Sequence, residues 1–393
     1  MIVTLKDITT KITKGTTPTS IGCKFEKSGI NFIKSESLVD GKTIDKSKFA
    51  FISERTHERL KRSQIEENDI LFSMAGMFLG KTGIATAEVV PANTNQAVAI
   101  IRVDDTKANY EYVYYYLNQK SVIHTINTTS AQSAQPNINL KQIGKIKINL
   151  PNRKKQDQIV SLLSAIDLKI SNNVEINDNL FAQMQALYAA WFIDCIPFGG
   201  IKPSSWQKTS IYTIADIIYG APFSSKQFNT DGKGIPIIRI RDLKEQKVAT
   251  YTTEKHPKGY LLQAGDIVVG MDGEFVPYIW GSDEAWLNQR VCVFKNKRLK
   301  GKAFLYFTIK PLLYAIEQTQ VATTVIHIGK KDFDAFEITL PDPRVLDSFD
   351  AITTPMVEKI VENRFEIKQL ELLRDAFLPK LMSGELDVSN IQL

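Results

Sequence analysis

The chain has 393 residues and a net charge of +6 at pH 7, and 43% of its residues are hydrophobic and 23% charged. These fractions are close to the average of globular proteins and exclude a chain that is disordered throughout. The three cysteines and four histidines are scattered, which argues against a disulfide framework or a zinc site and favours a reducing cytoplasm. Because no run of 18 apolar residues occurs, we expect no membrane-spanning helix.

The first predicted domain covers residues 1–151 and consists mainly of short β-branched runs, such as 29–33, 69–72 and 97–103. Gly, Asn, Asp and Pro separate these runs, a pattern typical of strands joined by turns. One helix is predicted over 109–120, with its tyrosine cluster packed on the sheet. Residues 75–82 loosely fit a phosphate loop, but the segment that follows indicates a strand rather than the required helix, so we interpret the match as accidental.

Two long segments follow the two strand-rich blocks and carry apolar residues every three or four positions, the pattern of a coiled-coil seam. The central helix is predicted over 152–192, followed by a linker over 193–204, and the C-terminal helix and tail cover 343–393. About 35 helical residues span roughly 50 Å, so the two helices are expected to pair antiparallel as a spacer. The seam residues expected to dock partner subunits are Ile159, Leu163, Ile166, Ile170, Met356, Ile360, Ile367 and Leu370.

Polar and proline residues interrupt these seams. Asn177 and Asn363 each occupy a seam position, where an asparagine either fixes the register of the two helices or lies at the wet margin of the seam. Both alternatives stay open at this point. Pro355 predicts a kink in the second helix, or a short helix before it and a long helix starting at the proline.

The second predicted domain, residues 205–342, repeats the layout of the first and includes a predicted helix over 302–319. Three pairs of stretches match between the copies: 68–76 with 265–273, 93–98 with 286–291, and 146–151 with 336–341. This internal repeat predicts a pseudo-two-fold α+β molecule, in which each of two similar domains is followed by a long helix. Its two working surfaces should be similar but not identical.

Polar and basic loops are the candidate working residues, because Ser, Thr, Lys and Arg hold phosphate oxygens and Arg, Gln and Glu read base edges. The alternative is that they are ordinary solvated loops. Asn95-Gln96 and Asn288-Gln289 are expected instead to hold backbone structure. The predicted DNA-binding residues are Lys14, Thr16, Thr17, Lys34, Ser35, Glu36, Lys81, Gln132 and Gln135 in the first copy, and Ser224, Ser225, Lys226, Arg239, Arg241, Asp242 and Lys330 in the second.

No pattern of a catalytic or metal site is apparent, since the chain has no cofactor-binding glycine loop, no base-gripping tetrapeptide and no convincing acidic pair. We therefore predict a non-catalytic chain. Two alternatives remain: a self-contained DNA-modifying enzyme, which methyl transfer by the chain alone would reveal, and a protein-binding scaffold. DNA affinity that falls steeply with added salt would argue against the scaffold.

The sequence resembles the specificity (S) subunit of type I restriction-modification systems over essentially its whole length. The stretches that carry the resemblance are 14–18, 32–38, 60–63, 93–100, 135–140 and, most specifically, 374–386. The segment 152–156 (Asn-Arg-Lys-Lys-Gln) departs from the Pro-Pro-x-x-Glu-Gln pattern of the family.

The resemblance implies two target-recognition domains that bind a bipartite, asymmetric site in double-stranded DNA. It also implies a helical spacer that docks two methyltransferase subunits, together with restriction and translocase subunits that cleave DNA with ATP. S-adenosylmethionine, ATP and Mg would then be bound by those partners, and this chain would need no cofactor of its own.

Overall fold

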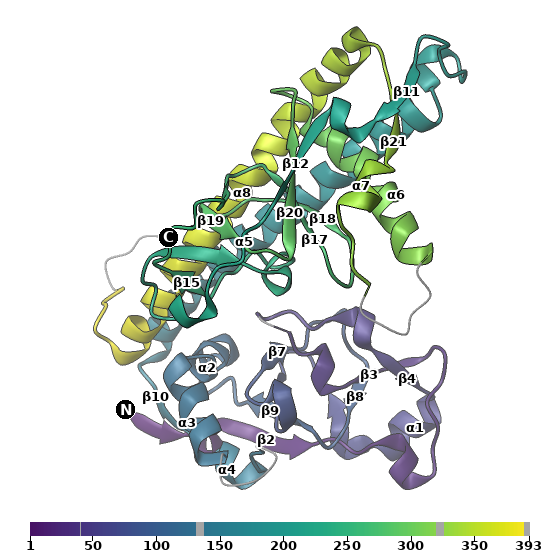
Figure 1. Ribbon diagram of the computed structural model, residues 1–393. Helices are drawn as coiled ribbons and strands as arrows, with labels where there is room; N and C mark the ends of the chain where they lie inside the picture. The colour runs from purple at the N-terminus through teal and green to yellow at the C-terminus, as the bar shows by residue number, and fades with distance from the viewer. Residues whose placement is uncertain (40, 131–136, 320–325, 389–393) are drawn as a thin grey trace. The chain divides into compact units, whose positions relative to one another are not determined.

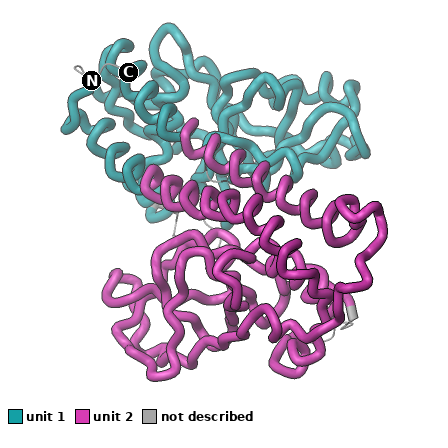
Figure 2. Tube along the Cα trace, turned by 90° about the horizontal axis from the view of Figure 1, so that it is seen from above, with its two compact units in different colours: residues 1–167, 372–393 teal, residues 168–371 magenta. Residues whose placement is uncertain are grey.

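The computed structural model describes residues 1–39, 41–130, 137–319 and 326–388 (Figure 1). The chain divides into two compact units, one of residues 1–167 and 372–393 and one of residues 168–371 (Figure 2). Each unit contains a β-rich domain and a stretch of both long helices, α5 (Arg153–Tyr188) and α8 (Pro343–Ser383). Because this division cuts both helices, it does not separate domains from helices, and the predicted domain boundaries stay predictions.

In the described part of the first unit, the β-rich domain combines two four-stranded sheets with one short ladder. The antiparallel sheet has the order β2 (Thr9–Lys14), β9 (Val98–Val103), β6 (Ile70–Ser73) and β7 (Thr82–Ile84). The mixed sheet has the order β4 (Ala50–Ile52), β3 (Ile30–Ile33), β8 (Ala92–Thr94) and β5 (Gln64–Ile65), with β3 and β8 parallel. The ladder pairs β1 (Ile2–Thr4) with β10 (Lys147–Asn149), and the helices are α1 (Glu54–Arg59), α2 (Tyr110–Leu117), α3 (Lys120–Ser130) and α4 (Leu140–Gly144).

The second unit repeats this topology, with one additional edge strand, β13 (Phe228–Asn229), in its mixed sheet. Its antiparallel sheet has the order β12 (Ala215–Tyr219), β20 (Val291–Asn296), β17 (Ile267–Gly270) and β18 (Pro277–Ile279). Its mixed sheet has the order β13 (Phe228–Asn229), β15 (Tyr251–Thr252), β14 (Ile235–Ile238), β19 (Ala285–Leu287) and β16 (Leu261–Leu262), with β14 and β19 parallel. The ladder pairs β11 (Gln207–Ser210) with β21 (Glu337–Leu340), and the helices are α6 (Lys302–Thr319) and α7 (Lys330–Asp334). The predicted internal repeat and α+β fold are confirmed.

Each domain also keeps one buried aspartate directly before its central strand. The carboxylate of Asp69 accepts hydrogen bonds from Nε and Nη2 of Arg102, both at 2.8 Å, and Asp266 accepts one from Lys295 Nζ at 2.9 Å. In both copies the carboxylate also accepts a bond from the backbone N–H three residues earlier, at 2.8 and 3.0 Å. A buried carboxylate requires such partners, which explains why this aspartate belongs to the repeated sequence pattern.

The two long helices pair antiparallel within each unit, as predicted. In the first unit Arg374 Nη1 donates to Asp167 Oδ1 at 3.0 Å. In the second unit Asn173 Nδ2 donates to Glu366 Oε2 at 2.8 Å. Contacts further along α5 therefore fall on earlier residues of α8, as expected for antiparallel helices. The apolar seams of both helices pack into the cores of the two domains.

The two seam asparagines bind each other. The side chain of Asn363 is fully buried, and its Nδ2 donates a hydrogen bond to Oδ1 of Asn177 at 2.9 Å. Asn177 is itself buried, so neither asparagine lies at a wet margin. The wet-margin alternative is therefore wrong, and the role of the contact in fixing the register of the helices stays a prediction.

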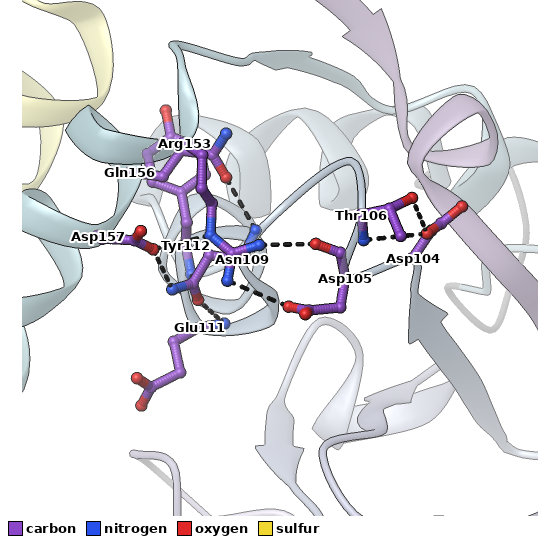
Figure 3. A network of polar contacts seen from close by, with 9 residues as sticks. All are labelled: Asp104, Asp105, Thr106, Asn109, Glu111, Tyr112, Arg153, Gln156 and Asp157. Carbon is purple, nitrogen blue, oxygen red and sulfur yellow. Dashed lines mark hydrogen bonds and ion pairs between the residues drawn. The ribbon is translucent and has the colours of Figure 1, made fainter.

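A polar network fixes the first β-rich domain to the start of α5 (Figure 3). The backbone N–H of Asn109 donates to Gln156 Oε1, and Asn109 Nδ2 donates to Asp157 Oδ1, both at 2.9 Å. Arg153 Nη2 donates to Asp105 Oδ1 at 3.1 Å. These contacts join the loop before α2 to the first turn of α5, so the domain and the helix are held together where the chain passes from one to the other.

Residues 152–156, which depart from the family pattern, include the N-cap of α5. The helix begins at Arg153, and the side-chain Oδ1 of Asn152 accepts a hydrogen bond from the backbone N–H of Lys155 at 2.9 Å. Asn152 therefore takes the N-cap position, for which asparagine is among the preferred residues.

Two predicted helix limits were wrong. The helix predicted over 109–120 ends at Leu117, and a second helix, α3, follows from Lys120. The alternative in which a helix starts at Pro355 is also wrong, because α8 continues through this residue. Pro355 and Ala351 are both exposed, so water can bind the carbonyl of Ala351 that has no proline N–H to accept. The helix predicted over 302–319 is confirmed as α6.

Candidate nucleic-acid interface

Some of the polar segments selected from the sequence lie beside one loop in each β-rich domain. We call this the central loop; it comprises residues 95–97 after β8 in the first domain and residues 288–290 after β19 in the second. In the parallel pairs, Ile33 lies opposite Thr94 and Ile238 opposite Leu287. The carboxyl ends of β3 and β14 therefore place residues 34 and 239 beside the start of the central loop.

A glycine backbone packs against the central loop in both copies. The N–H of Gly15 donates to the carbonyl of Val98 at 3.4 Å, and that of Gly220 donates to the carbonyl of Val291 at 3.0 Å. A Cβ atom at Gly15 would lie 1.8 Å from the carbonyl oxygen of Thr94, and one at Gly220 would lie 2.0 Å from the carbonyl oxygen of Asn288, in the same stretch of the second domain. Only glycine permits this approach, so the Lys-Gly-Thr and Tyr-Gly-Ala motifs have the same structural role.

Hydrogen bonds hold polar side chains of the first domain beside its central loop. The hydroxyl of Thr17 donates to Oε1 of Gln96, and Nη2 of Arg62 donates to Oγ1 of Thr16 at 3.3 Å. Arg62 was not among the predicted site residues, although the stretch 60–63 contributes to the family resemblance. The backbone-holding role expected for the loop asparagine is confirmed in this copy, because Asn95 Oδ1 accepts from the N–H two residues later at 3.0 Å.

The segment after β3 and the segment after β14 form the same short 3-10 turn, over Ser35–Ser37 and Ile240–Asp242. The residues before the turns, Lys34 and Arg239, have the same extended backbone. Glu36 and Arg241 therefore occupy equivalent positions, with opposite charges. The two domains thus present different hydrogen-bonding groups from one backbone scaffold.

The two predicted arginines of the second domain differ in their surroundings. Arg239 Nη2 donates to the hydroxyl of Thr250, its backbone N–H donates to Asp242 Oδ2 at 2.9 Å, and its guanidinium lies 5.9 Å from the ring centre of Phe228. The side chain of Arg241 is 68% exposed, with its Nε 3.8 Å from Asp242 Oδ1. Arg239 and Asp242 thus contribute to local structure, whereas Arg241 faces solvent.

The other predicted DNA-binding residues lie on several segments. Ser224, Ser225 and Lys226 are exposed, and Ser224 N–H donates to a glutamate carboxylate at 2.8 Å. Lys330 is exposed on α7 and pairs with the aspartate one turn later at 2.7 Å. The carbonyl of Lys81 accepts from Ser73 N–H at 2.8 Å. Gln132 and Gln135 lie outside the described residues, Ser35 belongs to the 3-10 turn described above, and Lys14 ends β2.

The phosphate-loop match is accidental, as predicted from the sequence. Residues 75–82 follow β6 but form a 3-10 turn over Gly76–Phe78 and then enter β7. No helix N-terminus follows to hold a phosphate group.

The predicted partner-binding residues divide into two groups by burial. Ile159, Leu163, Ile166 and Ile360 are buried inside the chain, and Ile170, Met356, Ile367 and Leu370 are partly buried. The exposed large apolar side chains of the long helices are instead Leu168, Val174 and Ile176 on α5 and Ile352, Leu372 and Leu373 on α8. In the buried group, Ile159 and Leu163 pack into the core of the first unit and Ile360 into the core of the second, and the predicted docking of partner subunits stays a prediction.

Within the described ranges, no three His, Cys, Asp or Glu residues lie together in a way that could hold a metal ion. The helices of the same ranges include none that is long and apolar enough to cross a membrane.

Comparisons with known proteins agree on one family. The "Type I restriction modification DNA specificity domain" family matches residues 1–180 and 203–360. The EcoBI specificity subunit of Escherichia coli is 37% identical over 138 residues, which is 35% of this chain and only 29% of that subunit's length. The MjaIX specificity subunit of Methanocaldococcus jannaschii is 24% identical over 326 residues, or 77% of this chain and 74% of that subunit. The solved S subunit from M. genitalium has a similar fold, with a TM-score of 0.56 and 15% identity over 97% of this chain and 96% of that one.

Proposed function

The chain belongs to the family of type I restriction-modification DNA specificity subunits, and we propose that each of its β-rich domains binds one half of a bipartite, asymmetric site in double-stranded DNA. As a specificity subunit it is the non-catalytic part of a type I complex. By this proposal it acts in the cytoplasm and directs adenine methylation and ATP-dependent cleavage. Partner subunits perform that chemistry with their own S-adenosylmethionine, ATP and Mg.

The observation that carries the proposal is the pair of equivalent 3-10 turns with different exposed side chains. The carboxylate of Glu36 can only accept hydrogen bonds, as from the amino group of cytosine, whereas the guanidinium of Arg241 donates two parallel bonds to guanine. Two domains with equal scaffolds and opposite hydrogen-bonding character would read two different half-sites. An asymmetric DNA sequence follows directly from this difference.

The structure supports different roles for the two arginines predicted to bind DNA. Arg241 is exposed and free to contact a base edge, whereas Arg239 is bonded to Thr250 and supports the turn. Replacement of Arg241 should therefore relax one half of the site, and replacement of Arg239 should chiefly lower the stability of the second domain.

We further propose that two methyltransferase subunits dock on the long helices through their exposed apolar residues. Leu168, Val174 and Ile176 project from α5, and Ile352 projects from α8, within the second unit. Exposed apolar side chains on helices are suited to partner interfaces. Restriction and translocase subunits would complete the complex that cleaves DNA.

The test is to co-express the chain with its modification subunit and map methylated adenines in the host DNA. A two-part asymmetric motif that disappears without this chain would support the proposal, and a motif that persists would favour a scaffold. Arg241→Ala should broaden one half of the motif only, while Lys244→Ala, an exposed cation three residues away, should leave it unchanged. Methyl transfer by the purified chain alone would instead revive the self-contained enzyme.

A further inference from the structure

A charged cluster lies at the end of the central loop in the second domain and was not predicted from the sequence. Arg290 Nη1 lies 3.4 Å from Asp272 Oδ1 and 3.3 Å from Nδ1 of His327. Nδ1 of His327 is in turn 2.6 Å from the same carboxylate oxygen. Three segments that are distant in sequence thus bring together a guanidinium, a carboxylate and an imidazole.

The backbone beneath this cluster is the same in both domains. The N–H of Met271 donates to the carbonyl of Arg290 at 2.9 Å, and the N–H of Met74 donates to the carbonyl of Ala97 at 2.8 Å. The carbonyl of Met271 also accepts a hydrogen bond from the N–H of Ile328 at 2.9 Å, and in the first domain the carbonyl of Met74 accepts one from the N–H of Ile138 at 2.9 Å.

The side chains on this shared scaffold have diverged. An isolated antiparallel bridge joins Asp272 to His327, and the equivalent bridge of the first domain joins Ala75 to Asn137. With Ala97 in the place of the arginine, the first domain has two alanines and an asparagine where the second domain has three ionisable groups. Because the folding contacts are kept, the substitution of charged groups is not required by the fold.

Exposure supports a role at the surface rather than in the core. The side chains of Arg290 and His327 are 55% and 49% exposed, and that of Asp272 is 25% exposed. A salt bridge at this exposure contributes little stability. The carboxylate also disfavours a phosphate contact, because it would lie within a few ångströms of the phosphate charge. It does orient the guanidinium, which is what a base contact requires.

We propose, as an extension of the proposed function, that Arg290, oriented by Asp272 and His327, reads a G·C base pair in the half-site of the second domain. The guanidinium donates to O6 and N7 of guanine, and the carboxylate can accept from the amino group of the paired cytosine. The first domain, with alanines at the equivalent positions, makes no such contact there and reads its half-site with other residues.

The test uses the full chain assembled with its modification subunits, first to define the wild-type motif and then to compare variants on duplexes that differ at single base pairs. Arg290→Ala should lower discrimination at one G·C pair of one half-site by roughly 5- to 150-fold, and leave the other half-site unchanged. Asp272→Asn, which keeps the shape but removes the charge, should weaken discrimination at the same pair by a smaller factor. Arg290→Ala should unfold at the temperature of the wild type, since this side chain is 55% exposed.

The outcomes separate the two proposals. If the wild-type complex has no two-part motif, the proposed function fails. If the motif exists but Arg290→Ala binds all sequences equally more weakly, with a shallower dependence on salt, Arg290 is a phosphate contact and the inference is overturned. A motif unchanged at every position in Arg290→Ala also overturns it. Lys297→Ala serves as the control, because this exposed lysine of the same domain pairs with Asp216 outside the cluster.

Discussion

The Asn177–Asn363 contact provides a test of how the helix pair is specified. Asn363 is fully buried, and its Nδ2 has Oδ1 of Asn177 as partner, whereas no donor among the described residues reaches its own Oδ1. The native pair is therefore already incompletely satisfied. A contact of this kind contributes specificity of register more than stability.

The three leucine variants should differ in a fixed order. Asn177→Leu leaves the buried Nδ2 of Asn363 without an acceptor and should lower the free energy of unfolding by about 1–3 kcal/mol. Asn363→Leu removes that donor together with the unpaired acceptor and leaves only Oδ1 of Asn177 without its partner. This variant should therefore lower the free energy of unfolding by about 1 kcal/mol or less. The double variant has no unpaired amide and should be about as stable as the wild type, or more stable.

Tryptophan fluorescence in urea is a suitable assay, because Trp191, Trp206, Trp280 and Trp286 all belong to the second unit, as do both asparagines. Asn172→Leu, at an exposed position of the same helix, should change stability by less than about 0.5 kcal/mol. If Asn177→Leu is as harmless as this control, or if the double variant loses as much as the two single losses together, the reasoning from the buried donor is refuted.

Three more outcomes are expected from the structure. Arg102→Met leaves the carboxylate of Asp69 buried without its cation and should destabilise the first unit by about 3–5 kcal/mol, measured by circular dichroism in urea; a loss under 1 kcal/mol would contradict the pairing. Gly220→Ala forces a Cβ against a carbonyl oxygen and should cost about 1–3 kcal/mol or more, measured by thermal unfolding; an unchanged melting temperature would show that the loop yields. Thiol titration of the native chain should find Cys23 the fastest-reacting cysteine, since burial raises the pKa of the Cys292 thiol and hides its reactive thiolate; fast reaction of Cys292 would contradict its burial.

The parts of the fold that sequence analysis predicted well are those written in local periodicity. The helix over 302–319 and the antiparallel pairing of the two long helices follow from apolar spacing. Matching stretches such as 93–98 and 286–291 coincide with equivalent strands and loops in the two domains. Where the prediction failed, local propensity did not decide: the proline at 355 is accepted because Pro355 and Ala351 lie on the exposed face of α8, where water can bind the carbonyl of Ala351.

The candidate site was harder to predict because contacts between residues distant in sequence decide which side chains are structural and which are exposed. Arg239 and Arg241 look alike in the sequence, and only the approach of Thr250 on the neighbouring segment separates a structural arginine from an exposed one. Arg290 directly follows an Asn-Gln pair that was expected to be structural. Its partners lie 18 and 37 residues away, and only the folded domain brings them to the same place.

The two domains, finally, show where change is tolerated. The buried Asp–cation pair and the glycine beside the central loop occur in both copies, and at each a different residue would leave an unpaired charge or a backbone clash. Glu36 and Arg241, by contrast, share a backbone position and differ in charge, and their side chains are 42% and 68% exposed. An exposed substitution usually changes stability by less than about 0.5 kcal/mol, whereas one good base contact discriminates by about 1–3 kcal/mol. Exposed substitutions can therefore change DNA recognition in one domain while barely changing its stability. This is why the same scaffold can serve two different half-sites in one chain.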